Sequence, residues 1–270
     1  MKFILFYYLY FVCRLVYQHF AYDAATGFYF LNVGQGDASI IKQSNLLGFV
    51  DGGPDYSADY FLDNLSPFFN CKIDFIVVSH PHKDHIGGFD RILERCKVTY
   101  VFYSEQGYNS QIWTRVLKSF VDSSAVIEAG DGTSVSFNDS GLSLLFLWPP
   151  IAKGCRISVN DCSLVALASV GDFEVLYTGD VSSSVSAKLL LPPLIEGNDG
   201  VDILKLPHHG GKNTLTSNLL AKIHPKSAVV SYGVANRYGH PAKETLDFMK
   251  AFDIPVSHTS NGLVLVKTYD

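Results

Sequence analysis

Three histidines and one aspartate crowd into the segment Ser79-His80-Pro81-His82-Lys83-Asp84-His85-Ile86-Gly87-Gly88. Imidazole and carboxylate groups together are ligands that suit zinc, manganese or iron. The apolar run from Asp74 to Val78 directly before this segment predicts a buried strand. The histidines would therefore lie on a loop that leaves the carboxyl end of a strand, where α/β folds place their chemistry. Because the chain has only nine histidines, the cluster indicates a metal site rather than a polar loop.

Two more segments place metal-ligand chemistry after predicted strands. Asp180 follows the run from Glu174 to Thr178 in a Thr-Gly-Asp sequence, so its carboxylate leaves a strand end; on its own it would read as a turn or helix-capping residue. His208 and His209 follow the strand predicted over 202–206. Adjacent residues point in different directions, so we expect one histidine to bind metal and the other to face the substrate.

Three other positions have chemistry to be assigned. His240, in a loop before a predicted helix, is expected to act as a general acid or to donate to a phosphate; the alternative is a surface histidine beside a helix. Asp51 follows a strand, and we expect it to accept a hydrogen bond from a ligand histidine. Gly34-Gln35-Gly36 suggests a dinucleotide fingerprint, but the third glycine and the following helix are missing, so that interpretation is rejected.

Further motifs follow in a fixed order along the chain. They are Leu31-Asn32-Val33-Gly34-Gln35-Gly36-Asp37-Ala38, Val50-Asp51-Gly52-Gly53-Pro54, Asn160-Asp161-Cys162-Ser163, Tyr177-Thr178-Gly179-Asp180, Leu206-Pro207-His208-His209-Gly210 and Asn236-Arg237-Tyr238-Gly239-His240-Pro241. Together with the histidine segment, they resemble the metallo-β-lactamase superfamily. Within it, they resemble the hydrolase domain of the bacterial competence protein ComEC and its free-standing relatives. The resemblance covers residues 28 to 266.

The resemblance implies the metallo-β-lactamase fold, a four-layer αββα sandwich, with one or two divalent metal ions, zinc or manganese. The implied metal ligands are His80, His82, Asp84, His85, Asp180 and His209. His80 and His82 would hold one ion, Asp84 and His85 the other, and Asp180 would bridge the two. Similarity to phosphorylcholine esterases favours His209 over His208 as the ligand. The implied catalytic residues are Asp84, His208 and His240, with Lys212 and Asn236 as substrate contacts.

The chain departs from the superfamily pattern in two places. Where most two-metal members have another histidine ligand, this chain has Asn160-Asp161, and an amide binds metals weakly. We therefore expect Asn160 to support the site from outside the ligand set, and the number of metals stays open. After His209 the family usually has Gly-Ser, whereas this chain has Gly210-Gly211, so any hydroxyl role would be lost or pass to Thr214.

Composition indicates a folded protein with a large core. The 270 residues are 47% hydrophobic and 17% charged, which fits one sizeable domain or two closely packed halves. The net charge of −5 is uneven: the segment 203–250 has seven Lys and Arg against two acidic residues, or +5, which leaves −10 elsewhere. A basic stretch beside a metal site would attract a phosphate-bearing substrate, although scattered solvated lysines give the same count.

The cysteines and the N-terminus bear on location. Five widely spaced cysteines include no C-x-x-C pair, and the odd count argues against a fully paired disulfide framework; Cys162 is expected to be a small buried apolar residue. Residues 1–25 are expected to be an apolar leader, with Lys2 before an apolar run too short to span a bilayer. The hydrolase domain would then cover 26–270, secreted or tethered to a membrane rather than cytoplasmic.

Apolar patterning predicts strands and helices that alternate twice. Helices are expected over 58–69, 88–96, 110–121, 183–191, 215–223 and 243–252. Strands are expected over 28–33, 38–42, 47–51, 74–78, 98–103, within 126–147, and over 164–168, 173–178, 201–206 and 228–231. Two short strands joined by a hairpin at Ser260-Asn261-Gly262 are expected to end the chain. Periodicity alone predicts mixed α and β structure, and the resemblance supplies the sandwich.

These observations predict a metal-dependent hydrolase, a phosphodiesterase or nuclease that uses a metal-activated hydroxide on DNA or RNA. One alternative is a hydrolase of small phosphoesters such as phosphorylcholine, or of a lactam or thioester. Another is a binding module on the same fold, which Asn160 favours and the near-complete ligand set opposes. The sequence has no set of channel-forming segments, so we expect the hydrolase alone rather than a complete DNA-uptake protein, with no obligate protein partner.

Overall fold

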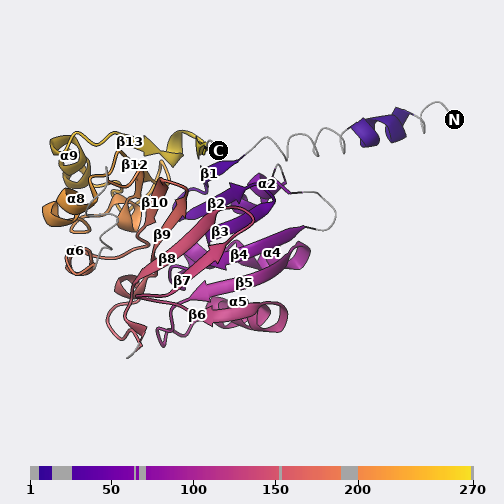
Figure 1. Ribbon diagram of the computed structural model, residues 1–270, viewed down its shortest axis with the longest axis horizontal. Helices are drawn as coiled ribbons and strands as arrows, with labels where there is room; N and C mark the ends of the chain where they lie inside the picture. The colour runs from indigo at the N-terminus through magenta and orange to yellow at the C-terminus, as the bar shows by residue number, and fades with distance from the viewer. Residues whose placement is uncertain are drawn as a thin grey trace.

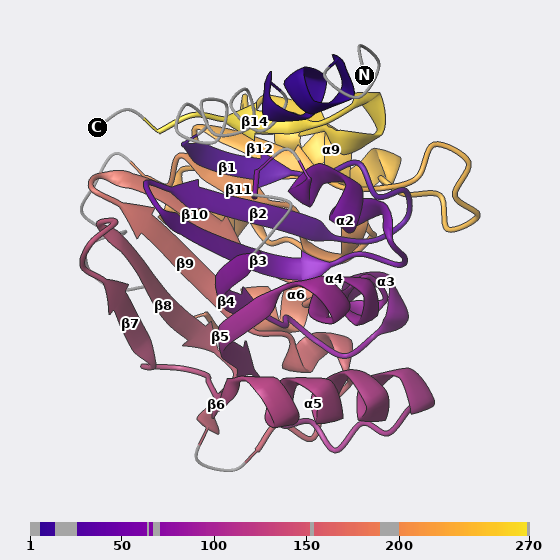
Figure 2. The ribbon, with the colours of Figure 1, turned by 90° about the vertical axis from the view of Figure 1, so that its right-hand side faces the viewer.

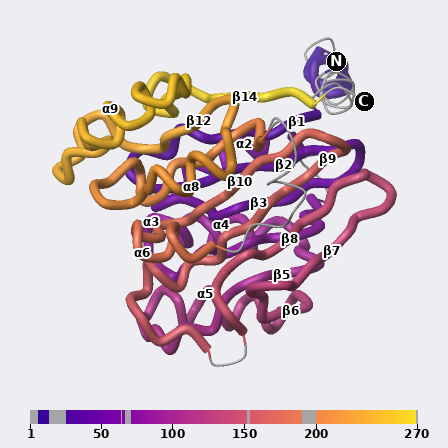
Figure 3. Tube along the Cα trace, turned by 60° about the vertical axis from the view of Figure 1, so that its left-hand side comes forward, coloured from indigo at the N-terminus to yellow at the C-terminus, as the bar shows by residue number. Residues whose placement is uncertain are grey.

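Two seven-stranded sheets pack face to face, and helices cover the outer face of each (Figure 1). The computed structural model describes residues 6–13, 26–63, 65–66, 71–151, 154–189 and 200–268. In Figure 1, α6, α8 and α9 lie on one side of the sheets and α2, α4 and α5 on the other, and Figure 3 shows the first three again along one side. This is the expected four-layer αββα sandwich of the metallo-β-lactamase fold.

The first sheet joins residues from both ends of the chain. Its order is β14 (Val264–Val266), β1 (Gly27–Phe30), β2 (Ala38–Gln43), β3 (Leu46–Gly52), β4 (Lys72–Val77), β5 (Lys97–Tyr103) and β6 (Ala125–Glu128). β14, β1, β2 and β3 pair antiparallel, whereas β3 to β6 pair parallel through helical crossovers. Figure 2 shows these strands from β1 to β6 as one twisted layer.

The second sheet repeats the change from antiparallel to parallel pairing. Its order is β13 (Val256–His258), β12 (Ser227–Val230), β11 (Ile203–Lys205), β10 (Phe173–Tyr177), β9 (Val165–Val170), β8 (Leu142–Trp148) and β7 (Ser134–Phe137). β7 to β10 are antiparallel, and β10 to β13 are parallel. Parallel strands end at the same edge, so the loops after β4, β10 and β11 have a place to converge.

The helices and the short 3-10 turns lie between these strands. They are α2 (Ser57–Leu62), α3 (Lys83–Ile86), α4 (Phe89–Arg95), α5 (Gln111–Ser123), η2 (Asn160–Cys162), α6 (Ser183–Ser186), η3 (Pro207–Gly210), α8 (Ser217–Ile223), α9 (Lys243–Ala251) and η4 (Thr259–Asn261). The longest, α5, begins at Ser110, whose hydroxyl accepts a hydrogen bond from the Trp113 backbone N–H. Of residues 1–25, only 6–13 are described, and they are helical.

The apolar core consists of three layers that follow from strand alternation. In β1, Phe28 and Phe30 point between the two sheets, while Tyr29 points to the layer that packs under α2, α4 and α5. A third cluster, which includes Leu176 and Leu204, packs under α6, α8 and α9. Because both faces of these strands are buried, their sequences are apolar almost throughout.

The predicted C-terminal hairpin is wrong. β13 and β14 lie on opposite sides of Ser260-Asn261-Gly262 as expected, but they do not pair: β13 joins β12 in the second sheet, and β14 joins β1 in the first. The turn η4 carries the chain from one sheet to the other. The strong Asn-Gly turn signal is local, whereas the pairing is decided by which open sheet edge each strand covers. The predicted helices at 58–69 and 183–191 extend past α2 and α6, with 64, 67–70 and 190–191 outside the described residues.

Four cysteines form two disulfides, Cys71–Cys96 and Cys155–Cys162. The first joins the start of β4 to the end of α4, and the second closes the loop that holds η2. Cys162 is buried, as expected, but it is not a separate apolar side chain, because its sulfur is bonded to Cys155. Cys13 is free and exposed. The odd number of cysteines therefore leaves one residue unpaired, while the other four are paired.

The pair Gly48–Phe75 offers a test of sheet packing. Gly48 in β3 lies opposite Phe75 in β4, and a Cβ at Gly48 would lie 2.1 Å from the ring of Phe75. We expect Gly48→Ala to lower the free energy of unfolding by about 1–3 kcal/mol, because the buried ring has no free space to enter. Urea denaturation measures this loss. In a Phe75→Leu background the same change should cost clearly less, and equal costs in both backgrounds would contradict the steric explanation.

Candidate metal centre

The predicted ligands meet at one edge of the sandwich, where strands of both sheets end. His80 follows β4 of the first sheet, whereas Asp180 and His208 follow β10 and β11 of the second. Asp51 lies at the end of β3, with a positive φ of 57° that turns the chain there. Loops from four strands thus bring together side chains that are far apart in sequence.

Asp180 lies at the centre of the group. Its Oδ1 is 3.4 Å from His85 Nε2, and its Oδ2 is 3.7 Å from His80 Nε2 and 3.9 Å from His209 Nε2. The Asp180 backbone N–H donates to the Ser163 hydroxyl, which fixes the carboxylate at the base of the site. This position between two groups of histidines is the geometry that a bridging carboxylate needs.

His80 and His82 lie side by side, as expected from their spacing. The distance from His80 Nε2 to His82 Nδ1 is 3.1 Å. The Ser163 hydroxyl donates to the Asn160 carbonyl and lies 3.3 Å from His80 Nδ1, so this nitrogen is the donor and Nε2 is free to face Asp180. His80 is fully buried, whereas His82 is about half buried beside the ring of Tyr108.

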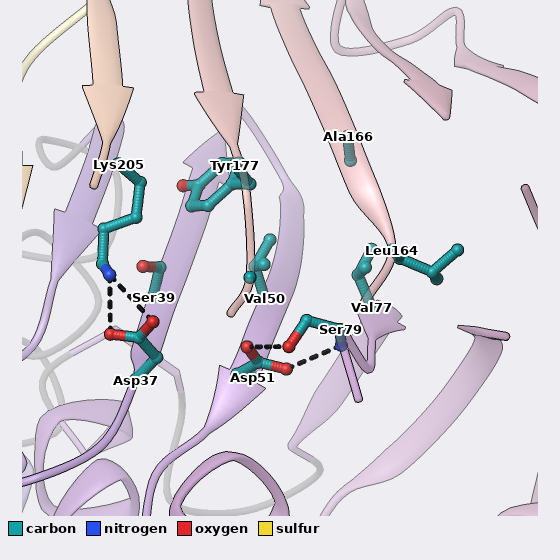
Figure 4. Close-up of a pocket in the computed structure, with 11 residues that line it drawn as sticks. Asp37, Ser39, Val50, Asp51, Val77, Ser79, Leu164, Ala166, Tyr177 and Lys205 are labelled. Carbon is teal, nitrogen blue, oxygen red and sulfur yellow. Dashed lines mark hydrogen bonds and ion pairs between the residues drawn. The ribbon is translucent and has the colours of Figure 1, made fainter. Parts of the chain in front are cut away.

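Asp51 fixes the ring of His85 through a hydrogen bond. Its Oδ2 accepts from His85 Nδ1 at 2.8 Å. The same Oδ2 accepts from the Ser79 hydroxyl at 2.7 Å, and Oδ1 accepts from the Ser79 backbone N–H at 2.8 Å (Figure 4). The expected contact of Asp51 with a ligand histidine is therefore present. Because His85 donates from Nδ1, its Nε2 is left as the atom that faces the site.

His208 and His209 differ in burial, as expected for a pair with two roles. The His209 side chain is only 2% exposed; its Nδ1 donates to the Ser231 carbonyl, and its Nε2 lies 3.4 Å from Asp84 Oδ2. The His208 side chain is 38% exposed, with its Nε2 3.7 Å from Asp180. Both residues have left-handed backbone angles, φ 50° and 54°, which cost energy outside glycine and which turn both rings toward the site.

The buried atoms at the centre fit a metal ion. His85 Nε2, His209 Nε2 and Asp180 Oδ1 are buried and make no hydrogen bond. Such atoms are costly to bury without a partner. Among the described residues, three groups of three side chains have ligand atoms close enough to share one ion: His80, His85 and Asp180; Asp84, His85 and His209; and Asp37, Asp51 and His85. Imidazole nitrogen and carboxylate oxygen form a donor set suited to zinc or manganese.

The electrostatics of the cluster also favour a cation. Burial opposes charge on Asp180, yet His85, His209 and His80 hold its pKa well below the usual value. Burial disfavours protonated His209, but Asp180 and Asp37 raise its pKa to about 9. The pKa of His85 is raised in the same way by Asp180 and Asp51, against burial. Burial and the nearby His85 instead lower the pKa of His80.

A buried ion pair lies beneath the site. Lys205 Nζ is 2.7 Å from Asp37 Oδ1, and both side chains are less than 8% exposed (Figure 4). Burial raises the pKa of Asp37, but Lys205 and His209 together lower it overall. The pair borders a cavity of about 10 Å³ between the sheets, which also contacts Tyr177 and Ser39. This is about the room that one water molecule needs.

His240 completes the rim of the site. Its ring centroid is 5.6 Å from that of His208 and 5.9 Å from that of His209. Burial, with His209 and His208 close by, lowers the pKa of His240, so the ring is neutral at neutral pH. The interpretation of His240 as an isolated surface histidine is therefore wrong, because its ring lies against two histidines of the cluster.

The side chain of Asn236 makes its hydrogen bonds within its own loop. Its amide donates to the carbonyls of Gly233 and His240, and its oxygen accepts from the backbone N–H groups of Tyr238 and His240. All four hydrogen-bonding positions of the amide are thus used within the loop. The expectation that Asn236 contacts substrate is corrected: the residue shapes the loop that carries His240.

Lys212 and Asn160 lie outside the group of candidate ligand side chains. Lys212 is exposed and lies with Lys243 in a shallow surface pocket beside α9; no contact among the described residues joins it to the histidines. Asn160 contributes its backbone carbonyl to Ser163, while its side-chain oxygen is buried without a hydrogen-bond partner. Fewer basic side chains of segment 203–250 can attract a phosphate than their number suggests. Lys205 is buried, and Lys226 and Lys243 pair with Asp202 and Asp247.

Sequence reasoning left four residues of the site without a role: Asp37, Lys205, Ser79 and Ser163. Asp37, Ser79 and Ser163 stood inside quoted motifs. A lysine within the apolar run Ile203-Leu204-Lys205-Leu206 was also a signal, because a charge in a buried strand needs a buried partner. Its partner Asp37 is 168 residues away, and nothing local in the sequence identifies it.

Comparison with known proteins agrees with this geometry. Residues 31–139 match the family model described as the metallo-beta-lactamase superfamily. The chain is 25% identical over 254 residues to ComE operon protein 3 of Bacillus subtilis (strain 168), which covers 87% of this chain and 32% of that protein. It is 25% identical over 232 residues to competence protein ComA of Neisseria gonorrhoeae, 84% of this chain and 30% of that protein. The chain thus spans about a third of the length of these curated relatives.

The fold has counterparts among solved structures. A crystal structure of a new diphosphatase from the PhnP family superposes with a TM-score of 0.55 at 15% identity, over 90% of this chain and 98% of that one. Fold and matched segment together define a protein with the metallo-β-lactamase fold. The resemblance to ComEC-like competence proteins is likewise confirmed.

Stability without metal should fall between pH 6.5 and 9. The pKa of His209, about 9, exceeds the ordinary value of 6.5, so the folded chain binds more protons than the unfolded chain in this range. The stabilisation is complete below pH 6.5 and is lost as the pH rises through 9, and His85 acts in the same direction. We expect the urea midpoint of chelator-treated protein to fall over this range. Zinc-loaded protein should show a flatter profile; a rise in the metal-free midpoint would contradict the assignment.

Proposed function

We propose that this protein is a metal-dependent phosphodiesterase, with nucleic acid as the favoured substrate. The observation that carries the proposal is the convergence of His85 Nε2, His209 Nε2 and Asp180 Oδ1, buried and without hydrogen bonds, at an edge where His208 stays exposed. Buried metal ligands at the bottom of a site, with polar side chains around its opening, are the arrangement of a hydrolytic site.

Two sets of residues would hold the metal. His80 and His82 form one set; Asp84, His85 and His209 form the other, and Asp180 lies between them. A divalent cation in this place supplies activation of a water nucleophile and neutralises charge that develops on the phosphoryl oxygens. Zinc and manganese both suit these ligands, and the proposal covers either.

The residues on the rim would handle the substrate. His208 is the more exposed of the adjacent pair, and we assign it to the phosphoryl oxygens. His240 lies next to it and would donate a hydrogen bond to the leaving-group oxygen. Lys212 is kept as a proposed contact to a neighbouring phosphate of a polymer, since its ammonium is exposed on the same half of the molecule.

The exposed loop before His240 favours a nucleic acid over a small phosphoester. Tyr238 is 59% exposed, its ring stacks on His240 at 5.7 Å, and the guanidinium of Arg237 lies 5.6 Å from its centroid. Exposed aromatic rings beside arginine are the means by which proteins hold unpaired bases. The name of one curated relative, competence protein ComA, agrees with a nucleic-acid substrate. The diphosphatase of similar fold favours the small-phosphoester alternative.

The two disulfides support a site of action outside the cytoplasm. Disulfides such as Cys71–Cys96 and Cys155–Cys162 persist in oxidising compartments and are rare in the cytosol. We therefore propose that the protein is exported or tethered at the outer side of a membrane. None of the helices in the described part of the chain has the length and apolar character of a membrane span.

Replacing Asp180 tests the proposed activity. Asp180→Asn removes the central carboxylate charge, so we expect metal content to drop. Replacing a residue that only supports a metal ligand typically costs about 10- to 100-fold, so for Asp180 itself we expect phosphodiester cleavage to fall by more than about 100-fold. Mass spectrometry gives metal per chain, and cleavage is followed with DNA, RNA and bis-nitrophenyl phosphate. Asp172→Asn, at the exposed turn between β9 and β10, is the matched control. A wild-type protein with bound metal but no turnover on any of these substrates would refute the proposal and favour a binding module.

Tyr238→Ala tests the nucleic-acid version. Loss of one stacking ring is expected to cost about 1–3 kcal/mol of binding to single-stranded DNA, or roughly a 5- to 150-fold rise in KM. KM for bis-nitrophenyl phosphate, which has no base, should rise much less. Tyr238→Phe keeps the ring and should behave like wild type. Equal effects on both substrates would argue for the small phosphoester.

A further inference from the structure

The loop Gly34-Gln35-Gly36-Asp37, which joins β1 to β2, contacts three parts of the site. The Asp37 backbone N–H donates to the Asp84 carbonyl, and the Asp37 side chain pairs with Lys205. Gly36 packs so closely that a Cβ there would lie 2.4 Å from the Asp84 carbonyl oxygen. The loop is therefore held against α3 by its backbone, and this fixes the point from which Gln35 extends.

Gln35 bridges this loop to the loop of His240. Its Oε1 accepts from the Gly233 backbone N–H at 3.3 Å, and its Nε2 lies 3.4 Å from His240 Nδ1. Gly233 permits this approach, since a Cβ there would lie 3.0 Å from the Gln35 nitrogen. The two loops are 198 residues apart in sequence and are joined by this one amide.

The bridge has only one consistent assignment of hydrogens. A backbone N–H can only donate, so the end of the amide that faces Gly233 must be oxygen. The other end is then an NH2 group, which can only donate, so His240 Nδ1 must accept. A neutral imidazole carries one proton, which is consequently on Nε2.

The rest of the loop keeps that Nε2–H in place. Asn236 holds the backbone of His240 on both sides, through its N–H at 3.0 Å and its carbonyl at 2.7 Å. His240 Nε2 lies against Gly211, where a Cβ would be only 3.2 Å away. The proton-bearing nitrogen therefore points to the turn that carries His208 and His209.

We infer that Gln35 is a positioning residue: it fixes His240 in the Nε2–H tautomer, so that the ring can only donate a hydrogen toward the site. His240 then donates a hydrogen bond from Nε2 to the departing oxygen of a cleaved phosphodiester and stabilises its negative charge; the proton stays on the ring, and the departing oxygen takes its own proton from water. The consequence for catalysis rests on the proposed function, whereas the tautomer does not. The motif that resembles a dinucleotide fingerprint is thereby given a role in orienting a histidine.

Gln35→Glu is the decisive variant. A carboxylate of nearly the same shape can only accept, so it should draw the proton of His240 to Nδ1 and leave Nε2 as an acceptor. Long-range nitrogen–proton spectra of zinc-loaded full-length protein identify the tautomer of each histidine. We expect Nε2–H for His240 in the wild type and Nδ1–H in Gln35→Glu. Nδ1–H in the wild type, or no change in the variant, would overturn the inference.

Leaving-group dependence gives the second measurement. A dinucleotide releases an alkoxide, whose developing charge gains from a hydrogen-bond donor, whereas bis-nitrophenyl phosphate releases a stable phenolate that gains little. Loss of one preorganised donor typically costs about 100-fold or more, so kcat of Gln35→Glu should fall at least tenfold further for the dinucleotide than for the nitrophenyl ester. A merely structural role would lower both equally, which would refute the catalytic part.

Two controls separate the possible failures. Gln111→Glu makes the same chemical change at an exposed position in α5 and should alter neither the His240 spectrum nor the ratio of the two kcat values. Gln35→Met removes both hydrogen bonds without adding a charge and should give a mixture of tautomers. If the wild type cleaves neither substrate, the proposed function fails, and the spectra still decide whether Gln35 fixes the tautomer.

Discussion

The structure depends on the cost of burying carboxylates at the meeting edge of two sheets. Asp37, Asp51 and Asp180 are almost fully buried, and each has found a specific partner that offsets its desolvation. Lys205 pairs with Asp37, Ser79 and His85 with Asp51, and three histidines surround Asp180. These contacts hold loops from both sheets in one geometry, and they leave the Nε2 atoms of His85 and His209 free at the centre.

A common pattern in the site is that the protein uses one nitrogen of each imidazole to orient the other. His85 donates to Asp51, His209 to the Ser231 carbonyl, and His80 has the Ser163 hydroxyl at its Nδ1. His240 follows the opposite rule, since its Nδ1 accepts from Gln35 and its Nε2 carries the proton. Three rings thus turn Nε2 toward the place where a metal ion would be held, and the fourth presents an N–H donor.

The sandwich supplies rigid anchors for this arrangement. In the first sheet β4 runs parallel to β3, and in the second β10 runs parallel to β11, so the residues that follow the strands of each pair leave the same edge of their sheet. Backbone strain is concentrated at the same edge, where Asp51, His208 and His209 have positive φ angles that ordinary residues avoid. The surrounding ion pairs and hydrogen bonds stabilise these conformations, and the resulting directions of the side chains differ from those of a regular turn.

The sequence by itself determined the residue types, most strand positions and the cluster from His80 to His85, because apolar alternation and ligand spacing are local properties. Its motifs also identified Asp180, His209 and the contact made by Asp51. Only the tertiary structure decided that Asp37 meets Lys205, that Gln35 reaches His240, that Asn236 serves its own loop, and that Cys162 is in a disulfide. The tertiary structure also decided that β14 pairs with β1 in the first sheet and does not form a hairpin with β13. Each of these depends on burial and pairing between segments distant in sequence, which no local pattern encodes.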